Sequence, residues 1–167
     1  MQIEIAPLRG LGHLSTTLAT WHVAEWGHLY DPAIWNHEIS IAEFDAMADG
    51  STTDQTWVAF DGSIRGETDV LGSVSLLTTD DLPGFAHLTP WLASLFVAPH
   101  ARGRGVGSML VEHALADAHS NGIATVYLFT AGQEQYYLAR GWQTIEQLEH
   151  RGEQAAVMVR TTSHAAR

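Results

Sequence analysis

Two residue types are missing from this chain of 167 residues, cysteine and lysine. Without cysteine there can be no disulfide, no thiolate metal site and no thiol nucleophile. Without lysine there is no amine for a P-loop phosphate site or for Schiff-base chemistry. The eight basic residues are all arginine, against nineteen acidic residues, which gives a formal net charge of -11. This balance argues against binding to nucleic acid or to an anionic membrane, because such binding depends on clustered positive charge.

Long apolar runs are absent too, since none approaches the roughly 20 residues that cross a bilayer. The first ten residues, "MQIEIAPLRG", lack the basic and apolar regions of a secretion signal. The sequence therefore predicts a soluble, cytoplasmic protein without membrane attachment. With 46% hydrophobic residues, the chain can form one well-buried core. We expect a single domain over residues 1–160 and a disordered tail over 161–167.

Hydrophobic periodicity predicts alternating strands and helices. Leu14, Leu18 and Trp21 recur at three- and four-residue steps, as on one face of a helix. Segments that alternate, or that are apolar on both faces, are typical of strands. Helices are predicted at 11–29, 35–46, 105–121 and 133–142, and strands at 3–8, 55–60, 70–77, 92–98, 124–130, 143–149 and 154–160.

One part of this order fixes the direction of two strands. The strands at 92–98 and 124–130 are joined by the helix at 105–121, and such a crossover makes its two strands parallel. The other strands are expected to be antiparallel, which gives an α+β fold with a mixed sheet and flanking helices. In such folds ligands bind where the carboxyl end of a strand meets the start of a helix.

That junction reads "APHARGRGVGSMLVEHAL", residues 98–115. The first four N–H groups of a helix have no partner within the helix and carry positive partial charge. Alternating glycines remove side chains that would hold an anion away from these groups, and they allow backbone angles that other residues resist. The glycines are Gly103, Gly105 and Gly107.

The distribution of charge around these glycines also favours an anion. No acidic residue occurs from 82 to 111, yet Arg102 and Arg104 stand within this range. Glycines that merely tighten a turn, beside solvated arginines, are the plainer alternative. A dinucleotide-binding loop is excluded because Ser108 occupies the third glycine position of G-x-G-x-x-G. The pattern predicts a ligand with several phosphates.

Two motifs carry a resemblance to a known family. "VAPHARGRGVG" resembles the pyrophosphate-binding signature of the GNAT superfamily of acyl-CoA-dependent N-acyltransferases, R/Q-x-x-G-x-G/A, which Arg102, Gly105 and Gly107 satisfy. "TAGQEQYYLARGW" is similar to the later motif of that family, in which an aromatic-Tyr pair precedes a Gly-aromatic pair. The resemblance implies a mostly antiparallel sheet of about six or seven strands, a splayed parallel pair and about four flanking helices.

The resemblance also implies acetyl-CoA as co-substrate. Backbone amides from Arg102 to Ser108 would hold the pyrophosphate, and Arg102 or Arg104 would meet the 3′-phosphate. The main chain around Phe96 would pair with the pantetheine arm, which requires the splayed strands. The cofactor-binding residues implied are Leu95, Phe96, Val97, Arg102, Gly103, Arg104, Gly105, Val106, Gly107, Ser108, Thr130, Gln133 and Tyr136.

For catalysis, the resemblance implies that Tyr137 is the general acid that protonates the leaving thiolate. Packing with a tethered hydroxyl is the alternative role for this side chain. Many relatives carry a glutamate as base on the fourth strand, near the position of Trp91 in this chain. Other carboxylates or a histidine could take the proton through water, although a solvated surface charge is the alternative for each. Glu25 is preferred because it lies on the first predicted helix, in the region that the resemblance implies shapes the acceptor site. The candidates are Glu25, Asp80, Asp81, His87 and Glu134.

Ten histidines raise the possibility of a metal site. His22 with Glu25, and His113 with Asp117, have helix-face spacings, but neither pair supplies three ligands. We expect surface pairing on a helix and no metal. Among the tryptophans, Trp26 and Trp91 are possible walls of an acceptor pocket.

The sequence thus predicts transfer of an acetyl group from acetyl-CoA to a primary amine, by direct attack. The acidic surface suits a cationic acceptor, such as a polyamine, an amino sugar or a peptide N-terminus. The protein would be a monomer or a homodimer. Two alternatives remain, a CoA-binding sensor that does no chemistry and a nucleotide-binding module of unrelated fold.

Overall fold

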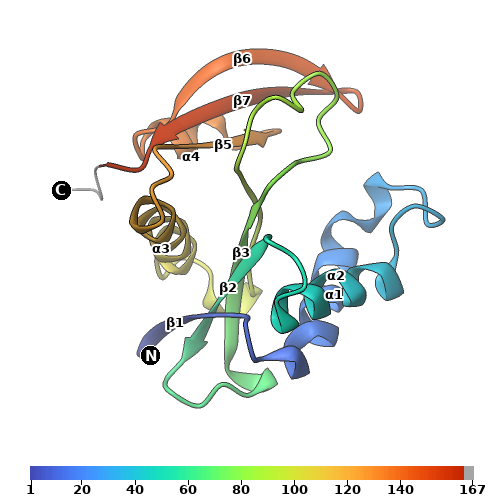
Figure 1. The fold of residues 1–167 in the computed structure, drawn as a ribbon, viewed down its shortest axis with the longest axis vertical. Helices are drawn as coiled ribbons and strands as arrows, with labels where there is room; N and C mark the ends of the chain where they lie inside the picture. Colours follow the sequence, from blue (N-terminus) through green and yellow to red (C-terminus); the bar gives the residue numbers. More distant parts are fainter. Residues whose placement is uncertain (164–167) are drawn as a thin grey trace. The chain divides into compact units, whose positions relative to one another are not determined.

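Seven strands form one hydrogen-bonded sheet, in the order β1-β2-β3-β4-β5-β7-β6, in the computed structural model, which describes residues 1–163 (Figure 1). The predicted class, a mixed sheet of six or seven strands with about four helices, is confirmed. The strands are β1 (Ile3–Pro7), β2 (Gln55–Asp61), β3 (Val70–Leu77), β4 (Trp91–Val97), β5 (Thr125–Thr130), β6 (Gln143–His150) and β7 (Glu153–Thr161). The helices are α1 (Ser15–Trp26), α2 (His37–Asp49), α3 (Val106–Ser120) and α4 (Glu134–Leu138).

The strand directions also agree with the prediction. β4 and β5 are parallel, with Trp91 beside Tyr127 in the register, as the helical crossover between them requires. β1 with β2, β5 with β7, and β6 with β7 are antiparallel. The β6–β7 pair contains a register shift between Thr144 and Glu146, so β6 does not follow β7 evenly.

The chain divides into two compact units. The first comprises Met1–Ser75 and Ser94–Val111. In its core the apolar faces of α1 and α2 pack on β1 and β2, through side chains that include Leu8, Leu18, Phe44, Val58 and Phe60. For α1 the buried Leu18 belongs to the stripe that the three- and four-residue spacing predicts. For α2 the predicted stripe, which includes Ile39, Ala42 and Ala46, is wrong, because Ala42 is exposed and the buried face is that of Ser40, Phe44 and Ala48.

The second unit comprises Leu76–Ala93 and the chain from Glu112 onward. It contains β5, β6, β7 and α4, and its core includes Leu82, Trp91 and Val157, with Tyr127 and Phe129 packed against them. The prediction of a single domain over residues 1–160 stays a prediction.

A glycine allows β3 to approach β4 closely within the first unit. A Cβ at Gly72 would lie 2.5 Å from the carbonyl oxygen of Phe96 and 3.2 Å from the Cα of Val97. These neighbours are backbone atoms, which cannot move aside as a flexible side chain can. The close approach of the β4 main chain therefore explains why β3 has a glycine at position 72.

The first residues of the expected disordered tail are ordered in the structure. β7 continues to Thr161, and Thr162 is buried, with its N–H donating to the Ala124 oxygen at 3.0 Å and its hydroxyl donating to the Ile123 oxygen. Residues 161 and 162 therefore belong to the fold. The rest of the predicted tail, residues 164–167, lies outside the described residues. None of the helices described is both long enough and apolar enough to span a bilayer.

Candidate functional site

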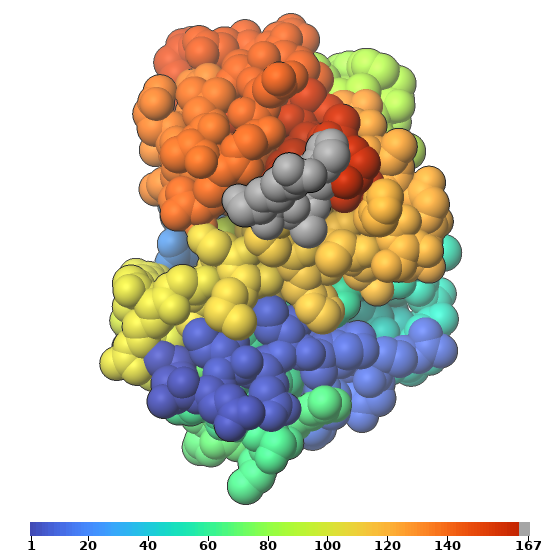
Figure 2. Space-filling view, turned by 90° about the vertical axis from the view of Figure 1, so that its left-hand side faces the viewer, coloured from blue at the N-terminus to red at the C-terminus, as the bar shows by residue number. Residues whose placement is uncertain are grey.

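The glycine-rich segment forms an exposed turn at the start of α3. Residues 102–105 are exposed and lie on the face shown in Figure 2, where this part of the chain is yellow. Gly103 and Gly105 have φ of 73° and 80°, in the left-handed region, and no heavy atom lies within 4 Å of a Cβ built on either. Gly107 is the second residue of α3 and is helical. The expectation of unusual backbone angles is therefore confirmed for two of the three glycines.

The N–H groups of this turn precede the hydrogen-bonding ladder of α3. The ladder begins where the Met109 N–H donates to the Gly105 oxygen at 3.0 Å. Within the described part of the chain, the N–H groups of residues 103–107 donate no backbone hydrogen bond. The Arg102 N–H donates to the Pro99 oxygen at 3.4 Å, so the set of available amides begins at Gly103. Such a set at a helix start binds anionic oxygens.

The two arginines of the turn differ in their surroundings. The Arg102 Nε–H donates to the Val97 oxygen at 2.9 Å, and its guanidinium carbon lies 5.8 Å from the centre of the Phe96 ring. Arg102 thus ties the turn to the end of β4. Arg104 is exposed and lies between the two left-handed glycines.

β4 contains an irregularity that the sequence does not reveal. Ser94 has φ of 55°, in the left-handed region, although it is neither glycine nor asparagine. Ala93, Ser94 and Leu95 are all half-buried, so the alternation of a regular strand is lost there. Phe96, just beyond the irregularity, is buried. Serine is not among the residue types enriched at positive φ, so its identity does not mark this position.

α1 covers Phe96 with aromatic rings. The centre of the Phe96 ring lies 5.3 Å from that of Trp21, 6.2 Å from that of His22 and 6.3 Å from that of Trp26. These contacts pack the Phe96 side chain of β4 against α1 within the first unit. Trp26, predicted as a possible pocket wall, is half-buried in this cluster.

His22 is buried, so the predicted surface pairing with Glu25 is wrong. Its side chain is 3% exposed, and its Nε2 shares a hydrogen bond of 3.2 Å with the Ser73 hydroxyl. Burial lowers the pKa of His22 to about 4, which keeps the ring neutral near pH 7. The sequence does contain a signal for the burial of His22, because His22 follows Leu14 and Leu18 at the same four-residue step and so lies on their face of the helix. Glu25 lies on the exposed side of α1.

Tyr137 lies on α4 among aromatic rings. Its ring centre is 5.1 Å from that of Tyr136 and 5.9 Å from that of Trp142, both edge to face. Burial, with a smaller contribution from Tyr136, raises the pKa of Tyr137 to about 12. The phenol is therefore protonated throughout the neutral range, as a proton donor must be.

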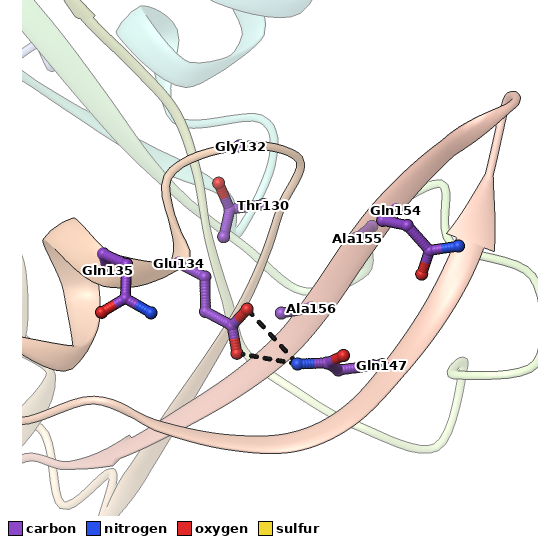
Figure 3. Close-up of a pocket in the computed structure, with 8 residues that line it drawn as sticks. All are labelled: Thr130, Gly132, Glu134, Gln135, Gln147, Gln154, Ala155 and Ala156. Carbon is purple, nitrogen blue, oxygen red and sulfur yellow. Dashed lines mark hydrogen bonds between the residues drawn. The ribbon is translucent and has the colours of Figure 1, made fainter.

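A cavity of about 280 Å³ lies beside the start of α4, within the second unit (Figure 3). The Glu134 carboxylate accepts hydrogen bonds from the Thr144 hydroxyl and from the Gln147 amide, the latter at 3.2 Å. The cavity is lined by Thr130, Gly132, Glu134, Gln135, Gln147, Gln154, Ala155 and Ala156. Of the residues assigned to the cofactor, it includes only Thr130. The glutamines of β6 and β7 belong to no motif, so no local signal could have found them.

The family model described as the acetyltransferase (GNAT) family matches residues 17–141. This chain belongs to the GNAT family. No curated protein matches its sequence.

Solved structures of GNAT proteins share the fold over nearly the whole chain. An aminoglycoside 6′-N-acetyltransferase in complex with coenzyme A has a TM-score of 0.71 at 16% identity, with 97% of each chain covered. A GNAT acetyltransferase from Staphylococcus aureus Mu50 has a TM-score of 0.70 at 14% identity. The match covers 97% of this chain and 100% of the other. The protein yncA from Salmonella typhimurium, solved with acetyl-CoA, has a TM-score of 0.70 at 14% identity. The match covers 100% of this chain and 98% of yncA.

In this GNAT protein the predicted site residues are divided between the two units. The first unit contains Glu25, the β4 residues 95–97 and the turn residues 102–108. The second unit contains Thr130, Gln133, Tyr136 and Tyr137. Within the second unit, the N–H of Tyr137 donates to the oxygen of Gln133 at 3.3 Å, so α4 follows directly on Gln133.

The strand position where many GNAT relatives carry a glutamate is closed in this chain. Trp91 is 1% exposed, and its indole N–H donates to the Leu88 oxygen at 2.8 Å. Trp91 thus belongs to the core and cannot form the wall of an open pocket. Among the candidate bases, Asp80 is set apart because burial raises its pKa to about 6, whereas Asp81 and His87 are exposed. No group of three or more possible metal ligands occurs among residues 1–163.

Proposed function

We propose that this GNAT protein transfers an acetyl group from acetyl-CoA to a primary amine. The observation that carries the proposal is the turn before α3, where Gly103 and Gly105 are left-handed and the amides of residues 103–107 remain available. Two solved structures of the same fold contain CoA or acetyl-CoA, which supports the choice of ligand.

The turn suits a diphosphate because its glycines place no side chain beside the available amides. A Cβ at Gly103 or Gly105 would meet no atom within 4 Å, so there is open space at these two positions. Amides of residues 103–107 would hold the pyrophosphate, and Arg104 would meet the 3′-phosphate. Arg102 would act indirectly, by holding the turn to Val97.

The main chain of β4 limits which residues can pair with the pantetheine arm. The Phe96 oxygen lies against Gly72, and the Ala98 N–H donates to the Leu71 oxygen at 2.9 Å, so both face β3. In a strand, successive residues direct their main-chain groups to opposite sides. Leu95 and Val97 are therefore the residues that would pair with the arm, and Phe96 would contribute packing. This pairing also requires β4 and β5 to splay.

The chemistry would proceed without a covalent enzyme intermediate. The acceptor ammonium loses a proton to water, and its nitrogen attacks the thioester carbon. The carbon–sulfur bond then breaks. Tyr137 donates its phenolic proton to the sulfur and is reprotonated by the proton that the nitrogen releases. Thr130, Gln133 and Tyr136 would line the groove beside it. The products are an N-acetylated amine and free CoA.

The acceptor would be a small amine or a peptide N-terminus. The net charge of -11 favours a cationic acceptor, and a solved relative in fold is an aminoglycoside 6′-N-acetyltransferase. We further propose that the protein acts in the cytoplasm as a monomer or a homodimer.

A CoA-binding sensor is the second candidate, because Trp91 fills the position of the usual carboxylate. A screen of primary amines with acetyl-CoA, read by release of free thiol, separates the two functions. We expect turnover with at least one amine. Binding of CoA without turnover on any amine would favour the sensor. Competition with NAD and ATP tests for a general nucleotide site, and displacement of CoA by either at equal concentration would contradict the proposal.

A further inference from the structure

The cavity beside α4 has a composition suited to a particular kind of acceptor. It contains one carboxylate, from Glu134, and the carboxamides of Gln135, Gln147 and Gln154, and its lining includes no basic side chain (Figure 3). We propose that this cavity is the acceptor subsite and that it binds a small, hydroxylated primary amine of the amino-sugar class. The inference rests on the acetyltransferase function proposed above.

The Glu134 carboxylate is held as a fixed acceptor for an ammonium group. The Thr144 hydroxyl and the Gln147 amide both donate to Oε1, and the second contact of Gln147, with Oε2, is longer at 3.4 Å. A carboxylate offers about four acceptor positions, so Oε2 retains capacity for a further donor. Because both partners come from β6, the carboxylate is oriented before any ligand arrives.

Glu134 is also close in the helix to the proposed proton donor. Glu134 and Tyr137 are both on α4 and are three residues apart, a spacing at which side chains are neighbours on a helix. An amine that is hydrogen-bonded to Glu134 would therefore lie about one helical turn from the phenol that protonates the leaving thiolate. This places the cavity near the reacting bond if Tyr137 has the proposed role.

The other lining residues favour hydroxyl groups over hydrocarbon. Each glutamine amide can both donate and accept, as can each hydroxyl of a sugar. Apart from Gly132, the apolar lining consists of the two small residues Ala155 and Ala156, so a long methylene chain would find little surface to bury.

The size and charge of the cavity further limit which acceptors can bind. Pockets for drug-sized ligands have volumes of about 300–1,000 Å³, and the cavity, at about 280 Å³, suits a single small ring. A phosphate or carboxylate on the acceptor would meet Glu134 without any basic partner in the lining, which disfavours anionic amines.

The test compares three amines of similar ring size as acceptors, namely glucosamine, cyclohexylamine and glucosamine 6-phosphate. With kcat/KM expressed for the unprotonated amine, because cyclohexylamine is the stronger base, we expect glucosamine to exceed each of the other two by at least about tenfold. Cyclohexylamine lacks the hydroxyl groups that would bond the glutamines, and the phosphate is repelled by Glu134. Equal or better use of cyclohexylamine or of the phosphate would overturn the inference.

A matched pair of variants tests the carboxylate itself. E134Q keeps the shape and an oxygen for Thr144 but removes the charge, and we expect KM for glucosamine to rise by about tenfold to hundredfold. E146Q changes an exposed carboxylate of β6 outside the cavity, and KM should not change. An unchanged KM in E134Q would contradict the inference.

Binding measurements separate this inference from the proposed function. Saturation-transfer NMR of glucosamine with the wild-type protein and CoA should show contact that E134Q weakens. If amines are acetylated but E134Q has no effect, the cavity inference alone fails. If no amine is acetylated while glucosamine still binds through Glu134, the proposed function fails and the cavity remains an amine site.

Discussion

At the scale of single residues, environment decides what each titratable group can do. Tyr137 and His22 are both aromatic groups enclosed by other rings, and in both the neutral form is favoured by burial. For Tyr137 the result is a phenol that keeps its proton until about pH 12. For His22 the result is a ring that acts as a packing residue near neutral pH, with Ser73 as its hydrogen-bond partner.

Replacing Tyr137 with phenylalanine should remove the proton donor and keep the ring packing against Tyr136 and Trp142. We expect kcat to fall by about 10²- to 10⁴-fold, with CoA affinity unchanged. In the wild type, no loss of activity from ionisation of Tyr137 should occur between pH 7 and pH 10, because its pKa is about 12. Steady-state kinetics and calorimetry with CoA would check both points. A variant with wild-type kcat would assign Tyr137 to packing alone.

His22 should make folding stability depend on pH. Its pKa is about 4 in the folded protein against 6.5 ordinarily, so below pH 6.5 the unfolded chain binds the extra proton. The free energy of unfolding should therefore fall as pH falls from 6.5 toward 4, by roughly 2 kcal/mol at pH 5 from this residue alone. Urea titrations at pH 7 and pH 5 measure the effect, and H22F should lose this part of the slope. An equal slope in H22F would mean that His22 is not the cause.

At the scale of elements, the close approach of β3 constrains β4, the strand that we propose pairs with the pantetheine arm. Gly72→Ala would place a Cβ 2.5 Å from the Phe96 oxygen, so β4 must shift. We expect a loss of about 1–3 kcal/mol in stability, together with weaker CoA binding. Gly12→Ala is the control, because its Cβ would lie 3.7 Å from that of Ala48, an ordinary contact. Thermal unfolding and calorimetry of both variants would show the difference, and equal behaviour would refute this role of Gly72.

At the scale of the whole molecule, local features of the sequence were predictable and those assembled from distant segments were not. The turn at 102–108 and the strand and helix beside it are contiguous, so composition and spacing identify them. Tyr137 and the Gly-aromatic pair of its motif, Gly141 and Trp142, are likewise close in sequence. The order of strands and helices from residue 3 to residue 160 also follows from periodicity, because apolar residues recur at different spacings in helices and in strands.

The remaining features depend on tertiary structure. The cavity beside α4 combines β5, α4, β6 and β7, and its glutamines are unremarkable when taken one at a time. The left-handed Ser94 results from tertiary constraints on β4 that no local preference of serine reveals. Trp91 could be aligned with a family position, but only the structure shows that its indole is buried.

The central claim is that the amides of the turn before α3 bind the diphosphate of CoA, and one pair of variants tests it most directly. Gly105 and Gly122 have φ of 80° and 77°, and a Cβ at either position would meet no atom within 4 Å. Alanine should therefore strain both turns equally, by about 1 kcal/mol. Calorimetry with CoA should show affinity reduced at least about tenfold in G105A and unchanged in G122A. Equal affinities in the two variants, or no heat of CoA binding in the wild type, would contradict the account.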